Sequence, residues 1–523
     1  MPQYLSPGVY IEEKNGGTKP MEMAGTSVVA FVGFTERRPE GNHGEPLMIT
    51  NWTQYQREFG GFVPGAFLPL SVYGYFLNGG SMCFIQSVMT VEEAAQKANS
   101  NGAAKLPKPA AMLTSKGDNV GPSLEAQSQT DGPVTVTITD PAPGGGDDLF
   151  KVVVRGPDGA EESFDNLTLG RAKGARNAVE VINRESKLIK LRELESTAPL
   201  AERRPAPGAY TIEAPKTETT AIVSPRTFEG DVTARIGLGG LEAVEEITMV
   251  CVPDLMSGYL SGHLTRDDVK AVQTAVMNHC ELMRDRFAIL DALPDMTPQQ
   301  VNDWRMKEAN YDSQFAALYY PWITVANPLA GNGQPSMIKI PPSGHLAGVY
   351  ARVDSERGVH KAPANEIIRG AVGLERQITK GEQDLLNPNG VNCIRAFPGR
   401  GIRIWGARTL SSDASWRYIN VRRLFSNVEE SVDAGMQWAV FEPNDPDLWA
   451  RITREITAFL RGYWAMGALF GATPDQAFFV KCDAELNPPE TRDLGQLFVE
   501  VGMAPVKPAE FLVIRFQQAS APG

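Results

Sequence analysis

Three short segments contain residue types that could carry out nucleophilic or phosphate chemistry. Ser336 and Lys339 have the SxxK spacing, but two prolines follow and no helix is expected to begin there. His279 and Cys280 are neighbours, and adjacent helical residues point about 100° apart, so the two side chains cannot face each other. Residues 237–240 are rich in glycine but lack the lysine of a phosphate-binding loop. These segments predict no catalytic residue.

The histidines and cysteines show no metal-binding pattern. No two cysteines form a CxxC pair, and no histidines have the spacing of zinc ligands. Five widely spaced cysteines also predict no disulfide framework, which fits a reducing compartment. The sequence therefore predicts neither a metal nor a cofactor. The residues considered are Cys83, Cys251, Cys280, Cys393, Cys482, His43, His263, His345 and His360.

Length and charge exclude several classes of protein. A chain of 523 residues is too long for one hydrophobic core, so several domains are expected. The formal net charge of -12 argues against nucleic acid and against an anionic membrane surface as the main partner. No apolar run approaches the ~20 residues that span a bilayer, and no secretory signal is recognisable. We therefore expect the chain to be made in a reducing cytoplasm and, if it leaves, to leave by lysis or as part of a particle.

Apolar runs of strand length alternate with segments of helical pattern, which predicts a parallel sheet with right-handed crossovers. A long segment, residues 91–226, differs in composition, because it is rich in glycine, proline, serine and threonine. We interpret it as a mostly-β insertion on the outside of an α/β domain. The expected buried strands are 26–34, 83–88, 247–252, 287–290 and 317–325.

The most informative run is residues 399–430. Ile402 and Ile404 alternate with polar or aromatic neighbours, which predicts a strand. A second alternation, from Trp416 to Val421, predicts another strand after a turn. From Val421 onward the apolar residues recur at three- and four-residue spacing, which indicates an amphipathic helix.

This run resembles the inner-domain signature of contractile tail sheath proteins, in the motifs WGARTL (405–410) and WRYINVRRL (416–424). Three other stretches match in the family's order: SPGVYIEE (6–13), PDLM (253–256) and PPSGHLAGVYARVDSERGVHKAPANE (341–366). Agreement among four stretches is stronger evidence than any single motif. The signature residues are Trp405, Arg408, Trp416, Arg422 and Arg423.

The resemblance implies a structural subunit and no enzyme. Such subunits form stacked hexameric rings around an inner tube in phage tails, R-type bacteriocins and extracellular contractile injection systems. The extended sheath is metastable, and it contracts without nucleotide hydrolysis to drive the tube through a target envelope. The implied partners are further copies of the chain, a tube protein, and baseplate and tail-terminator proteins. Neither nucleic acid nor direct membrane insertion is implied.

The resemblance also implies a tail-sheath-like fold of the α/β and α+β multidomain class. Residues 21–90 and 227–340 would form a middle α/β domain that carries the insertion 91–226. Residues 341–503 would form the core, tube-facing domain, between an N-terminal linking arm (1–20) and a C-terminal one (504–523).

Strands at both ends are expected to pair with neighbouring copies. Glycine and proline isolate the first strand, and Pro505 and Pro508, which cannot donate to a ladder, precede the last. Five of the six residues 511–516 are apolar, so an unpaired strand would expose an aggregation-prone edge. The expected arm residues are Val9, Tyr10, Ile11, Phe511, Leu512, Val513, Ile514 and Phe516.

A helix over residues 446–467 would place Arg451, Arg454 and Arg461 within about 80° of one another. The pattern alone favours a solvated face, whereas the resemblance implies that these arginines face the tube.

Two alternatives stay open. The chain could be the large sheath subunit of a type VI secretion system, although finding both the SPGVYIEE motif and the core motifs in one chain favours a self-sufficient subunit. Less favoured is a cytosolic α/β enzyme, because no constellation of catalytic residues supports it.

Overall fold

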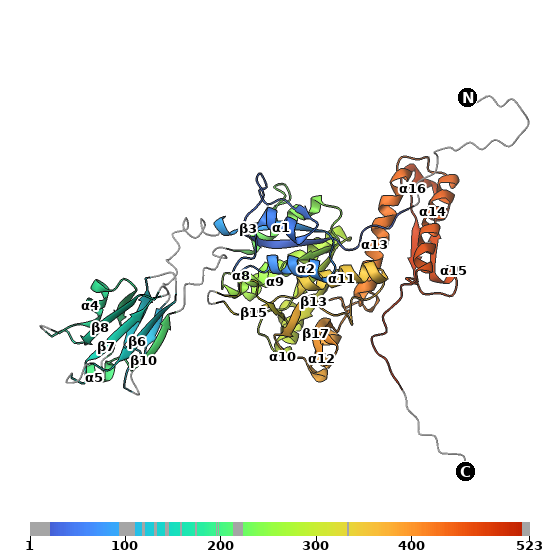
Figure 1. The fold of residues 1–523 in the computed structure, drawn as a ribbon. Coiled ribbons are helices and arrows are strands. Elements are labelled where there is room, and N and C mark those ends of the chain that lie inside the picture. Colours follow the sequence, from blue (N-terminus) through green and yellow to red (C-terminus); the bar gives the residue numbers. More distant parts are fainter. Residues whose placement is uncertain are drawn as a thin grey trace, which may run out of the picture. The chain divides into compact units, whose positions relative to one another are not determined.

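The computed structural model describes residues 21–93 and 110–514, except for gaps at 118–120, 130–132, 142–145, 157–158, 173–174, 195, 197, 213–222 and 332–333. The chain divides into two compact units (Figure 1). The larger contains residues 1–94 and 219–523, and the smaller contains residues 95–218. The fold is of the mixed α/β multidomain class, and each unit has its own hydrophobic core.

A mixed sheet of eight described strands forms the centre of the larger unit, in the order β18-β17-β13-β12-β11-β1-β3-β2. The inner strands are parallel, and the edge strands β2 and β18 run antiparallel to their neighbours. Burial on both faces explains why β1 is apolar along its length without alternation. The bounds are β1 Val29–Thr35, β2 Leu47–Ile49, β3 Cys83–Thr90, β11 Met249–Cys251, β12 Phe287–Asp291, β13 Ala316–Tyr320, β17 Val391–Phe397 and β18 Gly401–Ile404.

Helices pack against this sheet. In Figure 1, α2 and α11 lie side by side. Gly344 and Gly348 of α11 permit this approach, because a Cβ at either position would collide with Ser71 or Tyr75 of α2. The bounds are α1 Trp52–Phe59, α2 Leu68–Asn78, α6 Pro225–Glu229, α7 Gly237–Gly240, α8 Asp254–Leu260, α9 Arg266–Met283, α10 Pro298–Asp303, α11 Ser343–Arg357 and α12 Lys380–Leu386. A small antiparallel sheet joins β14 (Ile323–Ala326), β15 (Met337–Ile340) and β16 (Ala371–Leu374).

The last part of the larger unit has a hydrophobic core of its own, which we call the terminal module (residues 419–503). Two long helices, α13 (Ile419–Met436) and α14 (Pro446–Ala465), pack through Leu424, Val428 and residues of α14. The remaining elements are α15 (Pro474–Ala477), β19 (Phe478–Lys481), α16 (Pro489–Asp493) and β20 (Glu500–Met503), of which β19 and β20 form a two-stranded antiparallel sheet.

The smaller unit is mostly β. Its four-stranded sheet has the order β10-β6-β7-β8, and its three-stranded sheet has the order β4-β5-β9. Alternating side chains such as Val134, Val136 and Ile138 of β6 are buried, while the threonines between them face outward. The bounds are β4 Ala110–Leu113, β5 Leu124–Ser128, β6 Val134–Thr139, β7 Phe150–Arg155, β8 Glu161–Leu167, α4 Ala178–Glu185, β9 Ile189–Glu193, α5 Leu200–Arg203 and β10 Gly208–Ile212.

Three expectations from the sequence differ from the structure. The strand expected over residues 317–325 is divided, because β13 ends at Tyr320 and β14, which belongs to another sheet, begins at Ile323. The strand expected over residues 416–421 is wrong: a 3-10 turn spans Ala414–Trp416, and α13 begins at Ile419. Tyr418 makes only an isolated bridge to Arg408, so the short alternation has no ladder to join. The expected boundary at residue 341 does not separate hydrophobic cores, because α11, β17 and β18 belong to the sheet and its core. The second core contains residues of α13 and of the elements after it.

Candidate assembly site

Arg423 joins the terminal module to the sheet. It lies on α13 with 5% of its side chain exposed, and it pairs with Asp354 of α11, which is 1% exposed, at 2.5 Å. Its guanidinium also donates to the carbonyl oxygen of Thr26, just before β1, at 2.8 Å. Burial opposes the charge, but Asp354 outweighs it and raises the pKa of Arg423. This signature residue therefore ties three segments that are distant in sequence.

Arg422 and Trp416 form a second contact at the start of α13. The guanidinium carbon of Arg422 lies 4.4 Å from the ring centre of Trp416 and 4.7 Å from that of Phe315. Arg422 also pairs with Glu429 at 3.1 Å. Stacking on Phe315, next to β13, and on Trp416 fixes the direction in which α13 leaves the sheet, while the ion pair with Glu429 lies within the helix and orients the guanidinium.

Arg408 holds a residue of the C-terminal segment. Its guanidinium makes two hydrogen bonds with the carboxylate of Glu510, at 2.7 and 2.9 Å. Asn387 donates to the same carboxylate at 2.7 Å, and the hydroxyl of Tyr418 donates at 3.1 Å. Burial alone would raise the pKa of Glu510, but the hydrogen bonds from Arg408 and Asn387 lower it. We call these four residues the Glu510 clamp.

Trp405, the remaining signature residue, lies beside the clamp. Its ring packs on Phe397 of β17 with centroids 4.6 Å apart, and its carbonyl oxygen accepts a bond from Gln383. Trp405 also lines a groove of about 680 Å³, with residues 506–511 along one side. Of the signature residues, Trp405 and Arg408 thus lie at one place, and Trp416, Arg422 and Arg423 lie at the start of α13.

The C-terminal segment is bound up to Glu510 and exposed after it. Phe470 donates its backbone N–H to Ala504, and Val506 donates to Ala468. Residues 511–514, the described part of the expected last strand, form no strand and are 72, 85, 76 and 64% exposed. These four residues are Phe511, Leu512, Val513 and Ile514. An exposed run this apolar is prone to aggregate unless it pairs with another strand, as expected from the sequence.

The sheet of β19 and β20 is a candidate acceptor for such a strand. Within the described residues each strand is paired on one side only. Phe478 and Val480 face the module's core, whereas Phe479 is 52% exposed and lies over Gly502 on the other face. Two-stranded sheets are marginally stable in isolation, so further strands would stabilise this one.

The chain enters the larger unit along α13. Asn427 donates to the carbonyl oxygen of Ala24 at 2.9 Å, and the N–H of Ala24 donates to Ser431. Met21 packs so closely on Gly435 that a Cβ there would collide with it. The described chain therefore starts on the terminal module. The expected arm residues Val9, Tyr10, Ile11 and Phe516 lie outside the described residues.

The three arginines of α14 have different surroundings. Arg451 stacks on Trp438 at 3.7 Å and pairs with Glu455 at 3.4 Å, so it is engaged within the module. Arg454 and Arg461 are exposed. The tube-facing assignment of Arg451, Arg454 and Arg461 stays a prediction.

The place where an enzyme with this sheet would bind a ligand is filled. In doubly wound sheets that place is the carboxyl end of the strands where the order reverses, here at β1. Buried Asp254 lies there and accepts backbone N–H bonds from Phe34 at 2.6 Å and from Phe67 and Leu68. Burial raises its pKa to about 7 although these N–H groups lower it. Its contacts cap α2 and fix the end of β1.

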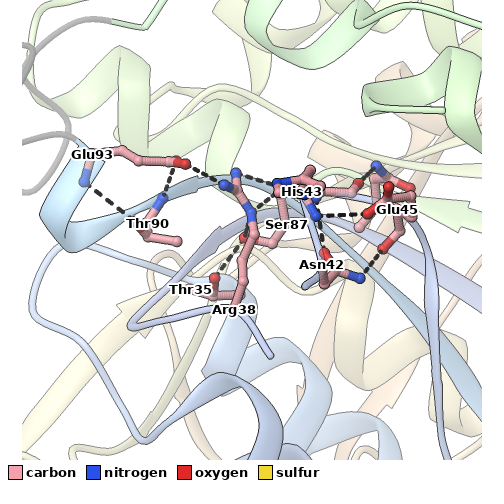
Figure 2. Close-up of polar contacts among 10 residues, drawn as sticks. Thr35, Arg38, Asn42, His43, Glu45, Ser87, Thr90 and Glu93 are labelled. Carbon is pink, nitrogen blue, oxygen red and sulfur yellow. Dashed lines mark hydrogen bonds and ion pairs between the residues drawn. The ribbon is translucent and has the colours of Figure 1, made fainter. Parts of the chain in front are cut away.

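A polar network occupies the same edge of the sheet (Figure 2). Arg38 donates to the carbonyl oxygen of Ser87 at 2.9 Å and pairs with Glu93. Thr35 and Ser87 share a hydrogen bond of 2.6 Å, and Glu93 accepts from the N–H of Thr90. These groups satisfy one another and fasten the end of β3.

The remaining reactive residues have structural surroundings. Burial raises the pKa of Cys280, and burial with the neighbouring Arg286 lowers the pKa of His279 to about 4. In the described part of the chain, no group of three or more potential ligands could hold a metal ion. No described helix has the length and apolar character needed to cross a bilayer.

Sequence reasoning missed the acceptor sheet and the clamp. The sequence pattern did not indicate that β19 and β20 pair with each other. Glu510 is a single acidic residue in an apolar terminal stretch, and this was the one available signal.

Comparisons with known proteins agree with this architecture. Residues 238–410 match the family model for the phage tail sheath protein central domain, and residues 411–519 match that for the phage tail sheath C-terminal domain. The chain is 27% identical over 313 residues to a putative prophage major tail sheath protein of Pseudomonas aeruginosa strain UCBPP-PA14, covering 58% of this chain and 74% of that protein. It is 27% identical to the tail sheath protein of Escherichia phage P2, covering 47% of this chain and 60% of that protein.

Two solved assemblies share the fold. The helical sheath of the anti-feeding prophage in its contracted state aligns with a TM-score of 0.59 and 23% identity, over 98% of this chain and 99% of that one. The contracted PVC sheath complex of an extracellular contractile injection system aligns with a TM-score of 0.56 and 23% identity, over 99% of each chain.

Proposed function

The chain belongs to the contractile tail sheath family, and we propose that its copies stack as hexameric rings around an inner tube and contract to drive that tube through an envelope. The family is one of structural sheath proteins. The observation that carries the proposal is that one chain contains both a two-stranded sheet with open edges, β19–β20, and an exposed apolar tail.

The linkage between copies would be strand addition. A tail from one copy that pairs with β19 or β20 of another gains backbone hydrogen bonds and buries its apolar side chains. The N-terminal segment would add a second strand in the same way, because it reaches the described structure along α13. Such contacts are heterologous, and heterologous contacts generate rings and open helices.

Extended arms suit a sheath that changes its diameter. Backbone pairing between an arm and its acceptor is preserved while the compact parts of the subunits move as rigid bodies. The energy of contraction would come from surface that the subunits bury against one another, without nucleotide hydrolysis. The partners would be a tube protein along the sheath, and baseplate and tail-terminator proteins at its ends. Assembly would take place in a bacterial or host cytoplasm, before release as part of a particle.

The test is removal of residues 1–13 from the full chain. We expect the shortened protein to unfold cooperatively at the parent's temperature but to form no rings or tubes in sedimentation and negative-stain microscopy. The matched control replaces residues 14–19 with a Gly/Ser segment of equal length, which keeps the expected strand and its reach. Tubes formed equally well without residues 1–13 would contradict the linking-arm mechanism.

A further inference from the structure

The C-terminal tail has two possible acceptors for its backbone. One is the β19–β20 sheet of another copy, as proposed above, and the other is the same sheet in its own copy. β20 ends at Met503, and the tail begins at Phe511. Residues 504–510 between them are enough for a turn, since most connections between adjacent strands are about 2–5 residues long. A tail paired in this way would block the β19–β20 sheet of its own copy, and it could not pair with the sheet of another copy.

The unpaired edge that such a tail would occupy can be located. Ala504 donates its N–H to the carbonyl oxygen of Ala477, the residue just before β19, so Gly502 and Glu500 of β20 also point their N–H groups toward β19. The N–H groups of Val501 and Met503 therefore point to the outer edge of β20.

The segment 504–510, which we call the strap, leads the tail away from this edge. On the terminal module it is held by the bonds of Ala504 and Val506 to Phe470 and Ala468. Asn420 donates to the carbonyl oxygen of Val506 at 3.0 Å. Beyond Val506 the strap borders the groove of about 680 Å³ and does not pack into a core. Its far end is fastened through the side chain of Glu510.

The contacts of that side chain form the Glu510 clamp. The carboxylate accepts two bonds from Arg408, one from Asn387 and one from Tyr418, and its side chain is 18% exposed. The next described residues, 511–514, are all exposed. Glu510 is thus the point at which the chain passes from bound to free. Arg408, Asn387 and Tyr418 all lie outside β19 and β20, beside the central sheet.

We propose that the Glu510 clamp is a latch that keeps the tail from pairing with its own β20 and so presents it to a neighbouring copy. The inference rests on the proposed function for the identity of the acceptor. It adds that donation is enforced by a polar anchor within the subunit. With the clamp closed, the strap is held at both ends and cannot form the turn that self-pairing needs. With the clamp open, self-pairing is favoured over donation, because an intramolecular partner has the higher effective concentration.

The experiment opens the clamp with Arg408→Ala and, separately, with Glu510→Gln. Hydrogen exchange of the dilute monomer would follow the amides of Val501 and Met503. We expect at least tenfold slower exchange than in the parent monomer, because the tail now covers these amides. Tube formation at equal protein concentration should fall at least tenfold. The swap Arg408→Glu/Glu510→Arg should return both quantities to within about threefold of the parent.

Two further variants separate the outcomes. Removal of residues 511–523 from the Arg408→Ala variant should restore fast exchange, since the covering strand is gone. The matched control Arg400→Ala removes a nearby arginine that does not contact Glu510 and should change neither quantity. Lost assembly without slower exchange would overturn the latch and leave Arg408 a purely structural residue. A second outcome combines slow exchange in Arg408→Ala monomers with fast exchange of Val501 and Met503 in parent tubes. The slow exchange would support control of self-pairing by the clamp. The fast exchange in tubes would contradict donation of the tail between copies, which is part of the proposed function.

Discussion

The buried pair of Arg423 and Asp354 is expected to be essential to the attachment of the terminal module. Replacing Arg423 with methionine keeps much of the side-chain volume but removes the charge. The carboxylate of Asp354, which is 1% exposed, would then keep the hydroxyl of Ser27, at 3.3 Å, as its hydrogen-bond donor. Leaving one member of a buried ion pair without its partner costs about 3–5 kcal/mol. The carbonyl oxygen of Thr26 also loses its donor.

The free energy of unfolding would be measured by urea denaturation, followed by tryptophan fluorescence. Trp416 lies against α13 and reports on the junction. We expect Arg423→Met to destabilise the protein by about 3–5 kcal/mol, and Asp354→Leu by a similar amount. The double variant should lie within about 1 kcal/mol of the parent, since two apolar side chains replace the pair. The cycle isolates the coupling between the two residues.

The control is Arg454→Met, because Arg454 is exposed on the neighbouring helix α14. Its effect should stay within about 0.5 kcal/mol. A loss below about 1 kcal/mol for Arg423→Met would refute the argument that this buried charge depends on its partner. Additive effects of the two single substitutions would refute it as well.

Three further results are expected. Replacing Arg454 and Arg461 with glutamate should leave the fold intact and prevent assembly on tubes, as scored by microscopy against a control variant, Arg226→Glu, which changes an exposed arginine on α6. Replacing residues 95–218 with a Gly/Ser linker should give soluble protein that still assembles, whereas failure to fold would show that this unit completes the α/β core. Burial, followed by the charge of Asp285, raises the pKa of Glu430 to about 7. Such a group stabilises the fold while protonated, so stability should fall as the pH rises through about 7, and Glu430→Gln should flatten this dependence in urea titrations between about pH 5 and about pH 8.

Local signals in the sequence located helix starts well. Thr265 caps α9 and forms a capping box with Asp268, and Asp445 caps α14 with Pro446 in the first position, which agrees with the helix expected from residue 446. These signals succeed because a cap depends on residues within one turn of one another. The strand expected at 416–421 failed for the converse reason. Whether an alternating segment forms a strand depends on a partner elsewhere in the chain.

Contacts between residues far apart in the chain could not be predicted from the sequence pattern. The motif containing Arg408 could be recognised, but nothing in the spacing indicates that its partner is Glu510, a hundred residues later in the chain. The division of the chain into cores was affected in the same way. Segments on both sides of residue 341 contribute strands to one sheet, and this pairing is set by the fold as a whole.

The positions of the linking elements also indicate which contacts would transmit force between copies. The described chain begins on α13, where Ala24 is bonded to Asn427 and Ser431. The acceptor β19–β20 packs on the same module, and the tail leaves from the clamp beside Arg408. A pull on the N-terminal arm would reach β1 directly along residues 25–28. Two further connections, α13 with the buried Arg423 pair and the strap with Glu510, would carry a pull on the acceptor or on the tail to the central sheet. Neither connection passes through residues 95–218. We therefore expect substitutions at these two connections to impair contraction more than any change in the smaller unit.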